Sequence, residues 1–135
     1  MVLVDAGPLI ALIHADDQQH GRCVEVFQEL TEPLGTVWPV LTKAMYLLSF
    51  SWKAQAPLWE MLYHGVIRVL TVADKDVSRM RVLMKKYKDL PMDLADAALV
   101  AVAERERIQQ IFTLDRRDFG VYRQAKLGRS ILLPR

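Results

Sequence analysis

Short apolar runs rich in β-branched residues alternate with longer helical segments along the chain, and this alternation limits the fold more than any other feature. The runs predict strands at residues 1–5, 66–72, 110–115 and 131–134, and the break at 33–39 has room for another short strand. Helical spacing of apolar residues predicts helices at residues 8–15, 16–32, 40–50, 55–65, 74–87 and 92–108. Because strands that alternate with helices favour a parallel sheet covered on both faces, we expect a three-layer α/β/α sandwich around a central parallel sheet of four or five strands.

Size and composition predict a single folded domain spanning residues 1–135, since 52% hydrophobic and 25% charged residues suffice to build a core. The net charge of +2 permits an anionic partner without requiring one. The single cysteine excludes an internal disulfide framework, and no apolar run reaches the roughly 20 residues of a membrane span. Asp5 within the apolar start argues against a signal peptide, so we expect a cytoplasmic protein without a membrane partner.

Two aspartates directly follow predicted strands. Asp5 ends the first apolar run, Asp115 ends "QIFTLD", and Asp118 lies three residues further on. In open α/β sheets, ligand sites lie beyond the carboxyl ends of the strands. We therefore expect Asp5 and Asp115 at the same edge of the sheet, where a ligand would bind.

Two further aspartates, Asp93 and Asp96, begin the predicted helix at 92–108 and share one of its faces, since they are three residues apart. Asp93 is equally well explained as a helix cap, and Asp96 could complement the helix dipole. Asp96 is harder to explain in this way, because the following "AALVAVA" is apolar on every side and indicates a helix buried between layers. A carboxylate in such a place is desolvated unless it is paired or bound to a metal.

Carboxylates that converge repel one another, and their pKa values rise unless a cation keeps them ionised. Oxygen ligands suit Mg²⁺ or Mn²⁺, which can assist the hydrolysis of a phosphodiester. The sequence contains neither G-x-x-x-x-G-K-[ST] nor G-x-G-x-x-G, so a nucleotide-binding loop of those types is unsupported. The residues alone therefore predict metal-assisted phosphodiester hydrolysis.

Three segments, "VLVDAGPLIALI", "DLADAALVAVAERE" and "IFTLDRRDF", resemble in this order the PIN domain family, specifically the VapC-type toxin ribonucleases of toxin–antitoxin pairs. The resemblance covers essentially the whole chain. It implies a compact α/β/α sandwich and an endoribonuclease that depends on Mg²⁺ or Mn²⁺. It also implies an RNA substrate, a homodimer and a cognate antitoxin that holds the enzyme inactive.

The resemblance also implies roles for individual residues. Asp5, Asp96 and Asp115 match the acids that bind the metal and serve catalysis in the family. Three further positions are secondary: Thr113 matches a Ser/Thr two residues before the last acid, Asp118 lies where members often carry an acid, and Asp93 is a frequent extra acid.

One position departs from the family pattern, because "VLTKA" places Lys43 where members carry a glutamate in a context like "VLTEA". Read alone, Lys43 belongs to a narrow polar stripe with Thr42 and reaches out to water. Read with the acids, its ammonium would neutralise Asp5 and Asp96 and weaken both metal binding and nuclease activity. Three explanations stay open: a natural departure, a substitution introduced to inactivate the chain, or a lysine that points away while Asp93 completes the site.

Basic residues near the last acid are candidates for RNA phosphate contacts, namely Arg116, Arg117, Lys126 and Arg129, although a solvated basic surface is the simpler explanation of each. Five aromatic residues could form an apolar groove for an antitoxin, or pack in the core or a dimer: Trp38, Tyr46, Phe50, Trp52 and Trp59. The leading expectation is a VapC-like endoribonuclease whose activity Lys43 impairs. The alternative is a non-catalytic module on the PIN fold that binds RNA or protein.

Overall fold

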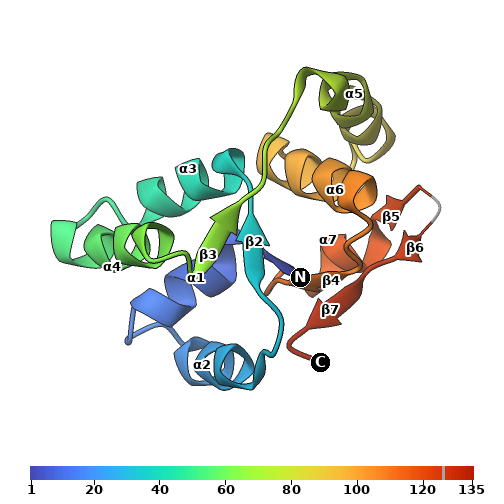
Figure 1. Cartoon of the computed structure of the whole chain (residues 1–135). Coiled ribbons are helices and arrows are strands. Elements are labelled where there is room, and N and C mark those ends of the chain that lie inside the picture. Colours follow the sequence, from blue (N-terminus) through green and yellow to red (C-terminus); the bar gives the residue numbers. More distant parts are fainter. Residues whose placement is uncertain (126) are drawn as a thin grey trace.

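A five-stranded parallel sheet forms the centre of the molecule, as seen in a computed structural model that describes residues 1–125 and 127–135 (Figure 1). Its strands, in spatial order, are β3 (Ile67–Val69), β2 (Leu34–Thr36), β1 (Val2–Val4), β4 (Gln110–Phe112) and β7 (Ile131–Leu133). Every pairing in this sheet is parallel, and Leu3 of β1 faces Gly35 on one side and Ile111 on the other. The predicted parallel sheet and α/β sandwich are confirmed.

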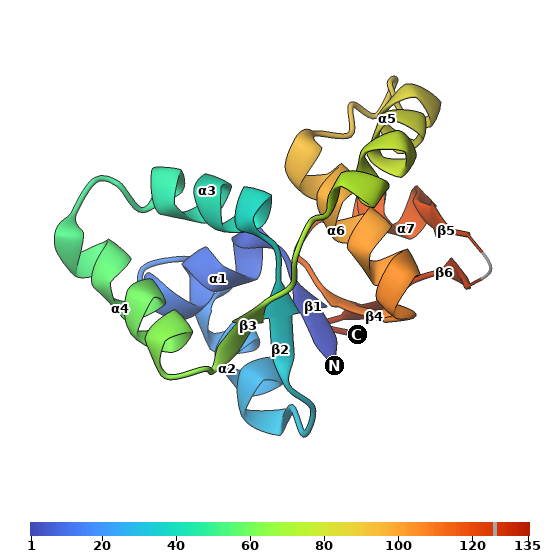
Figure 2. The ribbon, with the colours of Figure 1, turned by 45° about the horizontal axis from the view of Figure 1, so that its top comes forward.

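Helices cover both faces of this sheet. One group consists of α1 (Ala6–Ile13), α2 (His20–Glu29), α3 (Trp38–Leu47) and α4 (Trp52–Tyr63); in Figure 2, α1, α3 and α4 lie to the left of the strands and α2 lies below them. The group to the right consists of the 3₁₀ turn η1 (Asp74–Asp76), α5 (Val77–Lys86), α6 (Leu94–Glu106) and α7 (Arg116–Val121). None of the helices in the described part of the chain is long and apolar enough to cross a membrane.

The strand order reverses between β1 and β4. The chain runs outward from β1 through β2 to β3, then returns to β4 on the other side of β1 and continues to β7. Since such crossovers are right-handed, the reversal also moves the helices from one face of the sheet to the other. The carboxyl ends of β1 and β4 therefore flank a topological switch point, where ligands bind in sheets of this kind.

Helix α6 is the most deeply buried of the helices, because all nine residues from Ala95 to Ala103 are buried. It contacts α5 on one side and α3 on the other. The small side chains let α6 lie close to the sheet, and this confirms the helix predicted to be buried between layers.

Several elements differ from the sequence prediction; α4, for example, begins at Trp52 rather than at residue 55. Helix α2 begins at His20 rather than at residue 16, because Asp17 forms a turn in which its carboxylate accepts a hydrogen bond from the Gln19 amide at 2.8 Å. Helix α7 and a two-stranded antiparallel ribbon, β5 (Arg123–Gln124) with β6 (Gly128–Arg129), were not predicted. Such short elements bury few side chains, so they leave little periodicity to detect.

Candidate active site

Asp5 occupies the switch point, because it follows β1 directly and forms the N-cap of α1. Its side chain is buried, and Oδ2 accepts a hydrogen bond of 3.1 Å from the hydroxyl of Thr113. Oδ1 is buried without a hydrogen-bond partner among the described residues. Burial raises the pKa of Asp5 above its ordinary value, because desolvation disfavours the charged carboxylate.

Asp93 and Asp96 form a reciprocal capping box at the start of α6. Asp93 Oδ1 accepts from the Asp96 amide at 2.8 Å, and Asp96 Oδ2 accepts from the Asp93 amide at 3.4 Å. The cap interpretation of Asp93 is therefore confirmed. Burial, followed by repulsion from Asp93 and Asp5, raises the pKa of Asp96 to about 7.

Tyr122 is a site residue that the sequence analysis missed. Its hydroxyl donates a hydrogen bond of 3.2 Å to Asp96 Oδ2, and its ring packs on Phe119 and Tyr87 in the core. Burial and the nearby Asp96 charge raise the pKa of Tyr122, so its hydroxyl keeps its proton and remains a donor. The available signal was a tyrosine in the apolar stretch "FGVY", since a buried phenol needs a hydrogen-bond partner.

Thr113 connects Asp5 to Asp115. Its hydroxyl donates to Asp5 and accepts a hydrogen bond of 3.0 Å from the Asp115 amide, so one buried side chain fixes both positions. Asp115 caps α7, where its Oδ1 accepts from the Asp118 amide at 3.1 Å. Burial and then the Asp115 charge raise the pKa of Asp118, so these two carboxylates lie close to each other.

Lys43 lies at this cluster of acids, but its partner is not the one predicted. Its Nζ donates a hydrogen bond of 2.9 Å to Asp93 Oδ2, whereas the sequence analysis expected ion pairs with Asp5 and Asp96. This bond is the main cause of the raised pKa of Lys43. Burial tends to raise the pKa of Asp93, but the contacts with Lys43 and with the Asp96 amide hold it below its ordinary value.

Lys43 still acts on the two buried acids, because its charge favours the ionised forms of both Asp5 and Asp96. Asp93 takes the direct contact because it stands at the rim of the cluster, where both side chains of the pair keep nearly half of their surface exposed. The lysine is therefore neither a free surface residue nor a buried substitute for a metal ion.

The carboxylates are of the chemical type that binds a divalent cation, but they are not already arranged as a coordination site. Within residues 1–125 and 127–135, no group of three or more Asp, Glu, His or Cys side chains is placed to hold a metal together. Two observations nevertheless fit a hard cation, namely the unpartnered buried Oδ1 of Asp5 and the raised pKa of Asp96. Asp115 uses Oδ1 for its cap, which leaves Oδ2 outside that bond.

The candidate RNA-binding residues are not all at the site. Arg117 lies beside Asp118, where its charge favours the ionised carboxylate. Arg116 donates instead to the backbone carbonyl of Pro134. Arg129 lies at the opposite edge of the sheet, because its carbonyl accepts from Gln109, just before β4, so the prediction that it lies near the acids is wrong. Lys126 falls outside the described residues.

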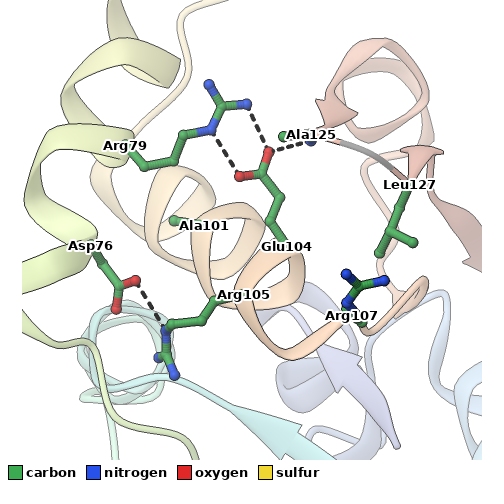
Figure 3. A pocket seen from close by; sticks show the side chains of 8 residues that line it. All are labelled: Asp76, Arg79, Ala101, Glu104, Arg105, Arg107, Ala125 and Leu127. Atoms are coloured by element: carbon green, nitrogen blue, oxygen red, sulfur yellow. Dashed lines mark hydrogen bonds and ion pairs between the residues drawn. The ribbon is translucent and has the colours of Figure 1, made fainter.

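A hollow of about 310 Å³ lies away from the acids, near the carboxyl end of α6, between α5 and the β5–β6 ribbon (Figure 3). Its charged side chains are largely paired with one another. Glu104 accepts two hydrogen bonds from Arg79, at 2.8 and 2.7 Å, and Arg105 donates to Asp76 at 3.0 Å. These contacts tie α5 and η1 to α6, so this hollow serves the fold and the acids at the switch point remain the candidate active site.

Comparison with known proteins identifies the family. The sequence matches the PIN domain over residues 2–125, which include every acid of the site. The chain belongs to the PIN domain family. This PIN domain is 27% identical over 135 residues to ribonuclease VapC26 of Mycobacterium tuberculosis, a match that covers 98% of this chain and 100% of the relative. The predicted family is thereby confirmed.

Solved structures share the fold of this PIN domain. The VapC20 toxin of M. tuberculosis, which cleaves the sarcin–ricin loop, has a TM-score of 0.79 at 20% identity, covering 87% of this chain and 92% of that one. A toxin–antitoxin complex from Klebsiella pneumoniae has a TM-score of 0.69 at 16% identity, covering 90% and 92%. VapBC2 from Rickettsia felis, bound to a promoter DNA fragment, has a TM-score of 0.63 at 15% identity, covering 88% and 91%.

Proposed function

We propose that this PIN domain is an endoribonuclease of the VapC type that depends on Mg²⁺ or Mn²⁺ and hydrolyses phosphodiester bonds in RNA. The observation that carries the proposal is the pair of buried carboxylates, Asp5 and Asp96, at the switch point of a PIN fold. One has a buried oxygen without a partner, and the other has a pKa raised to about 7. A hard cation would bind the unpartnered oxygen of Asp5 and stabilise the ionised form of Asp96, and would thereby offset the energetic cost of burying both carboxylates.

Asp5 and Asp96 would hold the ion, with Asp115 as a third ligand. A bound Mg²⁺ or Mn²⁺ would supply Lewis-acid polarisation of a phosphoryl oxygen. The protein's own contribution is orientation: Thr113 fixes Asp5, and Tyr122 fixes Asp96, through the hydrogen bonds that each hydroxyl donates. Arg117, whose charge acts on Asp118, would contact the RNA backbone.

Lys43 opposes the metal, because its ammonium already pairs with one acid of the cluster. This ion pair favours a second candidate function, a non-catalytic PIN-fold module that binds RNA or protein through the same surface. The two candidates differ in one respect: a nuclease must gain activity when the competing cation is replaced by a carboxylate, whereas a binding module need not.

An RNA cleavage assay in Mn²⁺ separates the candidates. We expect weak cleavage by the unsubstituted chain, stronger cleavage by Lys43→Glu, and none when Asp96→Asn is added to Lys43→Glu. Asn keeps the size of Asp96, and its amide oxygen can still accept from Tyr122, so folding should persist and circular dichroism would check it. Cleavage that survives Asp96→Asn would refute the assignment of the site, and absence of cleavage in every variant with RNA binding retained would favour the binding module.

We also propose a cognate antitoxin as partner and a homodimer as the assembled state. The support is the similarity to ribonuclease VapC26, together with two structures of the same fold, a toxin–antitoxin complex and VapBC2. A short reading frame immediately upstream, whose product co-purifies with this chain, would test the first proposal. Light scattering of the purified chain would test the second. A cytoplasmic location remains a prediction from the sequence.

A further inference from the structure

An apolar hollow of about 620 Å³ adjoins the acids, between α3 and the first turn of α6. Its apolar wall includes Trp38, Tyr46 and Leu94, and its polar wall is the Lys43–Asp93 ion pair. The polar wall belongs to the acid cluster, since Asp93 caps α6 in the same box as Asp96. The hollow and the candidate active site therefore share a boundary.

The aromatic side chains of the hollow stand in line on α3. Trp38, Thr42 and Tyr46 are four residues apart, a spacing that stacks side chains along one helical face. Trp38 is 56% exposed and Tyr46 is 76% exposed, so the core interpretation of these two residues is wrong. The Thr42 hydroxyl donates a hydrogen bond of 3.0 Å to the Trp38 carbonyl. It therefore needs no other acceptor on the exposed surface between the two rings.

We infer that this hollow binds an unpaired nucleobase of single-stranded RNA, next to the phosphodiester that the acids would cleave. The inference rests on the proposed nuclease function and names a subsite for its substrate. Its volume is within the range of small-ligand sites, about 300–1,000 Å³, and its walls combine flat apolar rings with one ion pair. A nucleotide has the matching chemistry, because its base stacks on aromatic rings while its phosphate carries the negative charge.

The polar wall favours RNA over an apolar protein segment as the occupant. Lys43 and Asp93 pair with each other there, so the wall presents a neutral, half-exposed ion pair beside the acids, and a nucleotide can cover it with polar groups. An apolar protein helix laid over this ion pair would desolvate it at a cost in free energy. Such a helix would instead extend over the exposed aromatic residues beyond the hollow, such as Phe50 and Trp52.

Fluorescence anisotropy tests the inference with a labelled 12-nucleotide single-stranded RNA of mixed sequence, in EDTA so that no cleavage occurs. We expect Trp38→Ala to weaken RNA binding by roughly 5- to 100-fold, the range for loss of one stacked base. Trp38→Phe should stay within about threefold of the natural sequence, because phenylalanine also stacks. Trp52→Ala is the matched control, because Trp52 is 67% exposed and lies outside the hollow.

A second RNA, abasic at every position, separates base contacts from phosphate contacts. The natural sequence should bind it less tightly than the intact RNA, whereas Trp38→Ala should scarcely distinguish the two. Equal loss of affinity in Trp38→Ala and Trp52→Ala, or no loss in either, would overturn the inference. A change of oligomeric state in Trp38→Ala with RNA binding intact would also overturn it and would assign the hollow to a protein interface.

These outcomes are independent of the cleavage assay, because anisotropy in EDTA measures binding alone. Absence of cleavage in every variant, with binding that still depends on Trp38 and on bases, would refute the nuclease and leave a base-binding site. Cleavage by Lys43→Glu with binding indifferent to Trp38 would support the nuclease and refute the base subsite.

Discussion

The ammonium of Lys43 lies 2.9 Å from Asp93 Oδ2 and joins α3 to the start of α6 across fifty residues of sequence. The pair is about half exposed, so it contributes little to folding, on the order of 0–1 kcal/mol. Its importance is electrostatic, because the same ammonium also acts on Asp5 and Asp96. A cation fixed at this rim should compete with any cation that binds within.

Replacing Lys43 by glutamate should raise the affinity for Mn²⁺. A unit charge about 4 Å away is worth about 4 kcal/mol at an effective dielectric constant of 20, and screening at this half-exposed rim reduces that value. We expect a gain on the order of 10-fold or more, measured by isothermal titration calorimetry. Lys43→Met is the matched control, because it removes the ammonium without adding a ligand, and it should fall between the two. Equal affinity in all three proteins would contradict the competition.

Tyr122→Phe should weaken the site and the fold together. The change deletes the hydroxyl that donates to Asp96 Oδ2 and should cost about 0.5–1.5 kcal/mol in the free energy of unfolding, measured with urea. It should also lower Mn²⁺ affinity, because Asp96 is no longer held in place. Tyr87→Phe is the control: it deletes a hydroxyl that accepts from the Arg123 amide at 2.9 Å, so it should cost similar stability and leave Mn²⁺ affinity unchanged. Equal Mn²⁺ affinities in the two variants would make Tyr122 purely structural.

Stability without metal should fall as the pH rises from 5 to 8. Burial, with repulsion from Asp93 and Asp5, raises the pKa of Asp96 from 3.8 to about 7, so within this range the folded chain retains a proton that the unfolded chain releases. The stabilising contribution is thus complete below about pH 4 and is lost as the pH passes through 7. The pKa of Asp5 is also raised and acts with the same sign, whereas that of Asp93 is lowered and acts only below about pH 4.

Thermal melts in EDTA at several pH values would measure this dependence, with Asp96→Asn as the comparison. The variant should show a flatter profile and a higher melting temperature than the natural sequence at pH 8. All other titratable groups are common to both proteins, so their contributions cancel in the difference. Parallel profiles would mean that Asp96 does not hold a proton near neutral pH.

Glu104→Gln should destabilise the fold and leave the site intact. Glu104 accepts two hydrogen bonds from Arg79 and a third, of 2.8 Å, from the Ala125 amide, so it joins α5 and the end of β5 to α6. Loss of the carboxylate should cost about 1–3 kcal/mol in the free energy of unfolding, because charge-assisted bonds are lost at a largely buried position. Mn²⁺ affinity should not change, since Glu104 lies at the far end of α6. Glu60→Gln, which breaks an exposed pair with His64, should have no measurable effect on stability.

The order of strands and helices was predictable because each is marked by apolar residues with a period of about 2 or 3.6. Such a pattern involves only residues that are close together in the sequence. The positions of Asp5 and Asp115 were equally predictable, since the carboxyl ends of parallel strands meet at one edge. Asp93 and Asp96 followed from helical spacing and from the apolar surroundings of α6.

Other features depend on contacts between distant segments. Tyr122 reaches Asp96 across 26 residues, through a short helix that leaves no periodic signal. Lys43 pairs with Asp93 rather than with Asp5 or Asp96 because Asp93 lies at the rim of the cluster. The spacing of residues within α3 cannot reveal this position. Arg129 is close to Asp118 in sequence, but the ribbon carries it to the opposite edge of the sheet.

The five alanines of α6 are buried and cannot be replaced by larger residues, so this part of the molecule cannot vary in sequence as freely as the exposed part can. A larger side chain at Ala98, which is fully buried, would displace the helix and carry the carboxylate of Asp96 with it, so packing and chemistry must change together there. Positions 38, 43 and 46 stand at the exposed rim and can be exchanged without repacking the interior. New substrate preferences or metal requirements are therefore accessible to this chain by single substitutions on α3, and laboratory evolution of specificity should find its mutations there.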